Sequence, residues 1–216
     1  MKDGHIHSPY CPHGSSDRFE QYIKKAIEVG VMVMTFTEHF PLPKNFKDPS
    51  PENDSAISED HLLAYFNELK ELKEKYKHNI KINIGVEVDY IEGYEKEIKE
   101  MLDKYGEYID DSILSVHMIK INDEYHLIDY SPEKFGELVD LLGSIENVYY
   151  KYYDTVKMAV NSDLGRYKPR RIGHLNLVRK YNKIYPYDYS GNEKLEEIVR
   201  IVKSKDYELD FNVSGY

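Results

Sequence analysis

Apolar and polar positions alternate most clearly over residues 81–90. In an extended chain, successive side chains point to opposite faces. One face of this segment carries branched apolar side chains and the other carries mostly polar ones: Ile82, Ile84, Val86 and Val88 against Asn83, Gly85, Glu87 and Asp89. The pattern predicts a strand with one apolar and one polar face, as in strands that line the inside of a barrel.

Similar short runs of apolar and β-branched residues predict further strands at 2–7, 31–37, 111–118, 170–174 and 207–213. Apolar residues three and four positions apart predict helices between them. Three helices are predicted to start near Asp17, Ser58 and Ser131-Pro132, and the first of them ends at Gly30. Four more are predicted over residues 94–105, 145–161, 175–181 and 195–202. Residues 40–56, with four prolines, predict a long loop, and residues 120–129 predict a hairpin around Asn122-Asp123.

Strands and helices thus follow one another in turn along the chain. That order is typical of an α/β fold with a parallel sheet and crossover helices, either closed into a barrel or left open. We count six strands, and no Gly/Ser-rich or Pro-rich linker divides the 216 residues, so we expect a single domain over residues 1–216.

Histidines and carboxylates gather where the predicted strands end. The carboxyl ends of parallel strands open on one face, where the active sites of such folds lie. Six of the nine histidines fall at these ends or in the loop that follows, together with Glu38, Glu87 and Asp89: His5, His7, His13, His39, His117 and His174. Neutral imidazole is a common ligand of transition metals, and a carboxylate such as Glu87 can bridge two cations. The arrangement predicts a metal site with room for more than one ion.

Several of these residues also allow a structural interpretation. Taken alone, His117 or His174 fits a histidine buried in the core better than a metal ligand. Glu38 is consistent with a residue that orients a histidine ligand. Cys11 lies among the histidines and could bind metal or serve the fold.

Charge and cysteine content limit the possible partners and location. With 29 Lys and Arg against 39 Asp and Glu, the formal net charge is −10, which disfavours nucleic acid and anionic membranes as partners. The single cysteine allows no intrachain disulfide, and we find no signal peptide or membrane-spanning run. We therefore expect a cytoplasmic protein.

Five segments resemble the polymerase-and-histidinol-phosphatase (PHP) superfamily, and more narrowly its histidinol-phosphate phosphatase branch. They occur in the family order: Asp-Gly-His-Ile-His-Ser-Pro-Tyr-Cys-Pro-His-Gly (3–14), Phe-Thr-Glu-His-Phe-Pro (36–41), Gly-Val-Glu-Val-Asp-Tyr (85–90), Ser-Val-His (115–117) and Ile-Gly-His-Leu-Asn-Leu-Val-Arg-Lys-Tyr (172–181). The resemblance implies a distorted (β/α)7 TIM-like barrel and hydrolysis of L-histidinol phosphate to L-histidinol and phosphate. It also implies two to three divalent ions (Zn, Fe or Mn) bound by His5, His7, His13, His39, Glu87, His117 and His174.

One family motif has no counterpart here. The family pattern continues past the Ser-Gly turn to further Asp and His ligands, whereas this sequence ends at Tyr216, directly after Ser214-Gly215. On the resemblance, we expect a barrel that lacks its last strand, looser metal retention, doubtful activity, and possible self-association through the open edge.

For catalysis we assign roles to Glu87, His117 and Arg179. Arg179, five residues after His174, is the first candidate for the cation that binds the substrate phosphate, although a solvated arginine paired with a carboxylate is as consistent with the sequence. Arg166, with Arg170 and Lys168, is a weaker candidate, and Glu38, with Asp89, could receive the substrate ammonium. Two other functions stay open: a PHP phosphoesterase for a different substrate, such as a nucleotide or phosphotyrosine, and a non-catalytic metal-binding module.

Overall fold

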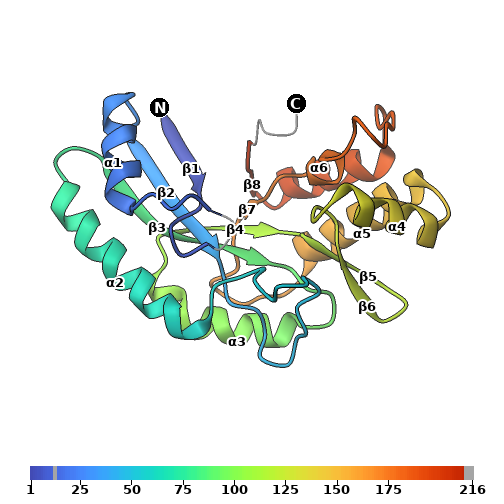
Figure 1. The fold of residues 1–216 in the computed structure, drawn as a ribbon, viewed down its shortest axis with the longest axis horizontal. Coiled ribbons are helices and arrows are strands. Elements are labelled where there is room, and N and C mark those ends of the chain that lie inside the picture. The colour runs from blue at the N-terminus through green and yellow to red at the C-terminus, as the bar shows by residue number, and fades with distance from the viewer. Residues whose placement is uncertain (12–13, 212–216) are drawn as a thin grey trace.

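The computed structural model describes residues 1–11 and 14–211, and a six-stranded parallel sheet runs through its centre (Figure 1). The strands lie side by side in sequence order: β1 (Lys2–Ile6), β2 (Val33–His39), β3 (Lys81–Asp89), β4 (Asp111–Ser115), β7 (Arg171–Ile172) and β8 (Glu208–Leu209). Each crossover therefore leads to the next strand, as in a barrel. The sheet curls until His5 Nδ1 on β1 lies 2.8 Å from Asp210 Oδ2, just after β8. The predicted α/β fold and the count of six sheet strands are confirmed.

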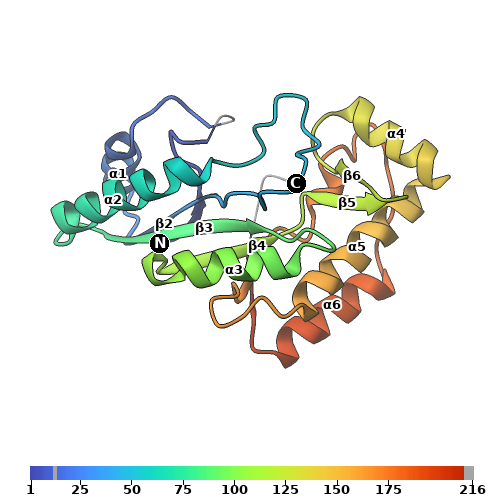
Figure 2. The same ribbon diagram turned by 90° about the horizontal axis from the view of Figure 1, so that it is seen from below.

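Helices and one hairpin connect the strands. They are α1 (Phe19–Glu28), α2 (Glu59–Tyr76), α3 (Glu95–Tyr105), the 3-10 turn η1 (Gly106–Tyr108), the hairpin β5 (Met118–Ile121) and β6 (Glu124–Leu127), α4 (Pro132–Leu142), α5 (Ile145–Asn161), the 3-10 turn η2 (Leu177–Arg179) and α6 (Glu193–Ser204). In Figures 1 and 2, α1, α2 and α3 flank β1–β4, and α4, α5 and α6 gather with the hairpin at the other end of the molecule.

Most of the predicted helix and hairpin signals are confirmed. Ser58 and Ser131 cap α2 and α4 by accepting hydrogen bonds from backbone nitrogens three residues ahead. Asn122 and Asp123 both have positive φ (49° and 65°), as a two-residue hairpin turn requires. At α1 the prediction is off by one residue, because Arg18 occupies the N-cap and Asp17 instead accepts a hydrogen bond from the Gln21 side chain.

Three predicted elements are clearly shorter than expected, and one of them is the strand expected over 170–174, which covers only Arg171–Ile172. The strand expected over 111–118 ends at Ser115, because the chain leaves the sheet there and Met118 pairs with Leu127 in the hairpin. The helix expected over 175–181 is only the 3-10 turn η2. Next to this turn, Lys180 Nζ and Tyr181 Oη both donate to the carbonyl oxygen of Asp129.

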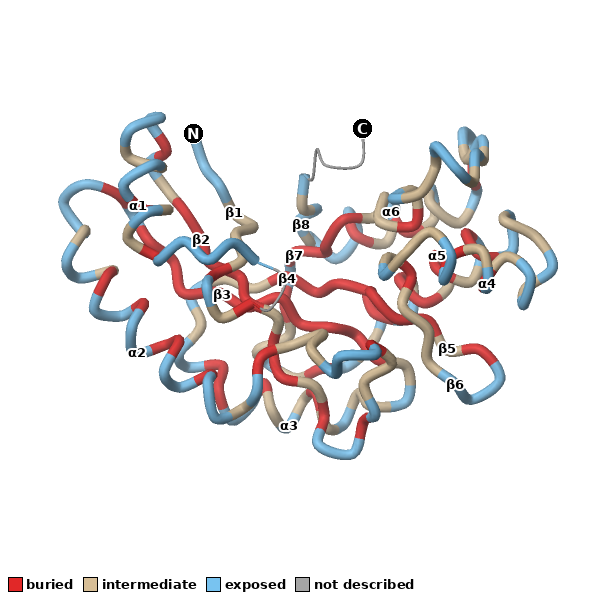
Figure 3. The backbone as a smooth tube through the Cα atoms, in the orientation of Figure 1, coloured by how far each residue is buried: buried red, intermediate tan, exposed pale blue. Residues whose placement is uncertain are grey.

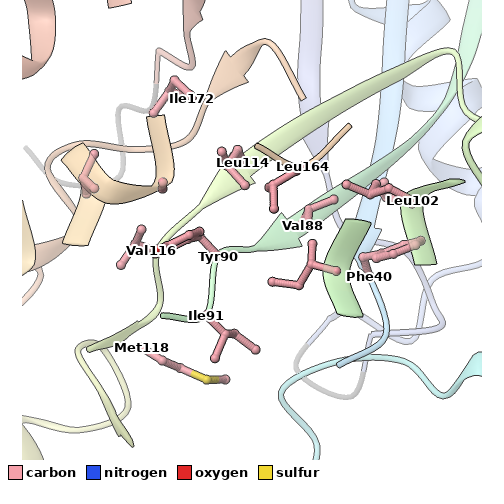
Figure 4. Packing of buried hydrophobic residues seen from close by; sticks show 14 of the residues in the cluster. Phe40, Val88, Tyr90, Ile91, Leu102, Leu114, Val116, Met118, Leu164 and Ile172 are labelled. Atoms are coloured by element: carbon pink, nitrogen blue, oxygen red, sulfur yellow. The ribbon is translucent and has the colours of Figure 1, made fainter. Parts of the chain in front are cut away.

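The two faces of β3 differ as its alternation predicts. Val86 and Val88 belong to the apolar cluster that also contains helix residues such as Leu102. Figure 4 shows Val88 and Leu102 in this cluster from close by. The buried stretches follow the central strands and the inward sides of the helices (Figure 3). On the other face of β3, Asn83 is buried and donates to Thr35 Oγ1, so the inside of the curled sheet is polar.

The end of the sheet is only partly described. β8 covers Glu208–Leu209, and the rest of the strand expected over 207–213 includes residues outside the described ranges. Self-association through this edge and a single domain over residues 1–216 stay predictions. Within the described ranges, no helix is both long and apolar enough to cross a membrane.

Candidate metal centre

Glu87, near the carboxyl end of β3, is the centre of a ring of histidines. Its side chain is fully buried (0% exposed). Nitrogens of His5, His7 and His39 approach Oε2 at 3.1, 3.4 and 3.7 Å. Nitrogens of His117 and His174 approach Oε1 at 3.6 and 3.2 Å. The five imidazoles that surround this carboxylate therefore come from the ends of four strands, β1, β2, β4 and β7, or from the residues just after them.

Asp89, two residues further along the same face of β3, is a second carboxylate that histidine side chains approach. Its Oδ1 lies 2.6 Å from His117 Nδ1, and its Oδ2 lies 3.8 Å from His39 Nδ1. Ser115 Oγ, at the end of β4, donates to Glu87 Oε1 at 2.6 Å. This hydroxyl has room because residue 173 is glycine: a β-carbon there would collide with Ser115 Oγ. The glycine before His174 therefore serves the packing of the centre.

The ligand-type atoms form three groups, each with its atoms within 4.8 Å of one another. The groups are His5, Glu87 and His174; His39, Asp89 and His117; and His7, Cys11 and His39. Imidazole, carboxylate and thiol are ligands of transition metals. The buried Nδ1 atoms of His7, His39 and His174 have no hydrogen-bond partner in the described part of the chain. Buried polar atoms are rarely left in this state, and these residues fit the binding of metal ions.

The charges of the centre are strongly coupled. Burial would raise the pKa of Glu87, but the neighbouring imidazoles, His117 foremost, bring it well below its usual range. Burial likewise opposes ionisation of Asp89, yet the charge and hydrogen bond of His117 lower its pKa to about 2. Conversely, burial lowers the pKa of His117 and His5, but their carboxylate partners outweigh it and raise these values to about 10 and about 9.

A cavity of about 860 Å³ opens beside the histidine ring. Besides the ligand-type residues, its lining includes Asp129, Tyr130 and Lys180. Lys180 Nζ donates to the carbonyl oxygen of Asp129 at 2.8 Å and to its Oδ2 at 3.1 Å. A cation and an anion therefore share one wall of the cavity.

Most of the predicted metal ligands meet in this structure, and His13 lies outside the described residues. His5, His7, His39, Glu87, His117 and His174 all line the cavity. The sorting of histidines to strand ends was the sequence feature that indicated this set.

The two predicted phosphate-binding arginines do not line the cavity. Arg179 turns its guanidinium onto the Tyr189 ring, 4.4 Å from the centroid, and donates to the Tyr189 hydroxyl at 2.9 Å. Arg166 is exposed, stacks over Tyr167 and precedes β7, whereas the centre lies at the carboxyl ends of the strands. The guanidinium groups of both arginines thus lie over tyrosine rings and not in the cavity.

The third predicted substrate-binding residue is Glu38, which lies beside Ser8 and His7. Its side chain is fully buried and does not line the cavity. It accepts hydrogen bonds from the backbone nitrogen and hydroxyl of Ser8, and its Oε1 lies 3.6 Å from His7 Nδ1. The alternative interpretation, a carboxylate that orients a histidine, agrees with this geometry.

Four charged residues near the centre had no role assigned from the sequence: Asp129, Arg171, Lys180 and Asp210. Lys180 stands next to the favoured Arg179 in the motif at 172–181. Arg171 opens the short buried strand that leads to His174, and a charge in such a strand is the signal that could have revealed it. Asp210 gives no comparable local signal, because its partner His5 is 205 residues away.

Known proteins with similar sequence and structure bear on this site. The PHP domain family profile matches residues 3–214. A histidinol-phosphatase from Bacillus subtilis (strain 168) is 45% identical, with 99% of this chain and 81% of the relative aligned.

Two crystal structures are also similar. A Listeria monocytogenes protein, described as a histidinol phosphatase, has a TM-score of 0.94 at 36% identity, covering 99% of this chain and 82% of its own. Histidinol phosphate phosphatase from Lactococcus lactis, solved with zinc, L-histidinol and phosphate, has a TM-score of 0.70 at 25% identity, covering 98% and 72%. The match of the family profile to nearly the whole chain, on a curled parallel sheet with a histidine-ringed glutamate, means that this chain belongs to the PHP domain family.

Proposed function

We propose that this protein is a metal-dependent phosphatase that hydrolyses L-histidinol phosphate to L-histidinol and phosphate. The observation that carries the proposal is the fully buried Glu87, approached by five imidazoles beside an open cavity. The 45% identity to the Bacillus histidinol-phosphatase supports this substrate. The L-histidinol and phosphate bound by the Lactococcus relative support it as well.

The proposed metal ligands are those that the sequence predicts, with Asp89 added. The residues that would hold the ions are Glu87, Asp89, His5, His7, His39, His117 and His174, with His13 as a further ligand. We expect two to three divalent ions, zinc, iron or manganese, of which zinc is the one bound in the Lactococcus relative. Such ions stabilise charge on phosphate oxygens and lower the pKa of the attacking water.

The other residues of the cavity bind and orient the substrate. Lys180, which lines the cavity, replaces Arg179 as the proposed cation for the phosphate. Its partner Asp129 is the proposed anion for the substrate ammonium. This pair offers both charges that a phosphorylated amino alcohol needs, and it sits in the cavity lined by the metal ligands.

The proposal is tested by loading the metal-free protein with zinc, manganese or iron and measuring phosphate release from L-histidinol phosphate. A panel of a nucleoside monophosphate and phosphotyrosine tests the alternative substrates. We expect turnover of L-histidinol phosphate alone. Turnover of another member of the panel would favour a different phosphoesterase, and metal binding without any turnover would favour a non-catalytic module.

A further inference from the structure

We propose that Asp210 and Arg171 are positioning residues that aim His5 at Glu87. The proposal rests on the metal-dependent function proposed above. The His5 ring spans two carboxylates: its Nδ1 lies 2.8 Å from Asp210 Oδ2, and its Nε2 lies 3.1 Å from Glu87 Oε2. Asp210 belongs to none of the three groups of ligand-type atoms, so its contact with the ring is separate from theirs.

Arg171 holds Asp210 in turn. Its Nη1 donates to Asp210 Oδ1 at 2.9 Å, and its Nη2 donates to the Gly4 carbonyl oxygen at 2.8 Å and to Asp111 Oδ2 at 3.0 Å. The Arg171 and Asp210 side chains are only 7% and 8% exposed. One buried guanidinium therefore ties together β1, β4 and the residue after β8.

The backbone pairing in these parts of the sheet is irregular or short among the described residues. The register between β1 and β2 shifts between Asp3 and Ile6, which is where His5 lies. At the other edge, among the described residues, β8 pairs with β7 at two positions, and the Asp210 nitrogen adds one backbone hydrogen bond to the Ile172 carbonyl oxygen. His5 thus lies at a register shift, and Asp210 lies just after a short strand pairing. The side-chain contacts of Arg171 restrain both places.

The contact decides which nitrogen of His5 faces Glu87. With the Asp210 carboxylate on Nδ1, the proton of the neutral ring sits on Nδ1 and the Nε2 lone pair is free for a metal. A carboxylate in this position also makes the imidazole a stronger ligand. By contrast, the Nδ1 of His174 has no hydrogen-bond partner in the described residues, so His5 and His174 are held in different ways.

The test compares zinc affinity, by competition with a chelator, between wild type and Asp210→Asn. We expect one zinc ion to bind about 10- to 100-fold more weakly, with kcat reduced and KM for L-histidinol phosphate little changed. In the zinc-loaded protein, nitrogen NMR of His5 should show the proton on Nδ1 in wild type and a loss of that preference in Asp210→Asn. Asp206→Asn is the matched control, because Asp206 is an exposed aspartate that contacts Arg170.

Arg171→Lys supplies an independent test should Asp210→Asn fail to fold, since it keeps the charge but not the fork that binds two acceptors. We expect a smaller loss of zinc affinity at the same ion. Unchanged zinc affinity in both variants would overturn the proposal. Complete loss of one ion from Asp210→Asn at saturating zinc would also overturn it, because Asp210 would then be a ligand itself. A wild type that binds zinc but releases no phosphate would refute the proposed function and still leave positioning to be decided by the affinities.

Discussion

The two halves of the sheet, β2–β4 and β4–β8, differ in how many backbone positions pair between neighbouring strands. On one side, β2 pairs with β3 at seven consecutive positions and β3 with β4 at five. On the other side, β4 pairs with β7, and β7 with β8, at two positions each. The long ladders position His39, Glu87 and Asp89 through the backbone. Near the short ladders, the charged contacts of Arg171 tie Asp210 to β1 and β4.

The residues of the metal centre are therefore held in place in two ways, by backbone pairing in one half of the sheet and by side-chain contacts in the other. Residues on the long strands are positioned by the backbone hydrogen bonds between strands and by apolar packing. Residues near short strands need side-chain partners of their own. Substitutions in the two regions should therefore separate loss of folding from loss of metal.

The largest effect is expected at Glu87, where both regions meet. Glu87→Gln removes the charge that faces five imidazoles, and we expect kcat to fall by ~10³-fold or more, since metal ions supply several kcal/mol of transition-state stabilisation. Phosphate release and metal content by elemental analysis measure the loss. Glu197→Gln, on α6, serves as a control at a partly exposed glutamate. Full activity of Glu87→Gln would contradict the proposed centre.

The next effect concerns apolar support on the side of the long ladders. Leu102 on α3 is fully buried, so Leu102→Ala should lower the free energy of unfolding by about 2–5 kcal/mol. Leu141→Ala, at a leucine 48% exposed, should change it by less than about 0.5 kcal/mol. Denaturant unfolding of the metal-free protein measures both. Equal losses at the two leucines would argue against the apolar layer as the main support.

The charged support can be weakened without touching His5. Asp111→Asn takes a charged acceptor from Arg171 and should cost about 1–3 kcal/mol of unfolding free energy. Because Asp210 still binds Arg171 and His5, zinc affinity should change less than in Asp210→Asn. The combination of a stability loss and near-normal zinc affinity is the expected result. The reverse combination would mean that Asp111, and not Asp210, governs the centre.

Acidity should affect metal binding in a defined direction. The pKa values of His5 and His117 are raised to about 9 and about 10 in the metal-free protein, so both rings carry protons near pH 7 that a metal must displace. Zinc affinity should therefore rise with pH by about tenfold per pH unit for each displaced proton, with both rings contributing up to about pH 9 and His117 alone up to about pH 10. Chelator competition across this range measures it, and an affinity independent of pH would contradict the charge state assigned to these histidines.

The smallest effect separates two neighbouring cations. Lys180→Gln should raise KM for L-histidinol phosphate by about tenfold, which corresponds to one charged hydrogen bond of ~1.5 kcal/mol. Arg179→Gln should leave KM nearly unchanged, because its guanidinium is held by Tyr189. Steady-state kinetics of both variants provide the comparison. A larger effect at Arg179 would restore the assignment made from the sequence.

The sequence predicted those parts of the protein that depend on periodicity and residue type. The alternation around Glu87 predicted β3 and its polar face, and the histidines at strand ends predicted the members of the centre. Arg179 could not be placed, because its direction depends on a tyrosine ten residues further along the chain, outside the quoted motif. Arg171 and Asp210 were missed because each has its partners on other strands, brought near only by the curl of the sheet.

The contact between His5 and Asp210 also has a consequence for the order of events during synthesis. At ~5–20 residues per second, the 205 residues between them take about 10 to 40 seconds to add. Once β3 has been made, β1, β2 and β3 can pair, while the Nδ1 of His5 still lacks the Asp210 carboxylate. A ribosome that pauses late in the message therefore holds a chain with most of its sheet and an unfinished metal centre. Complete metal loading then belongs to the finished chain.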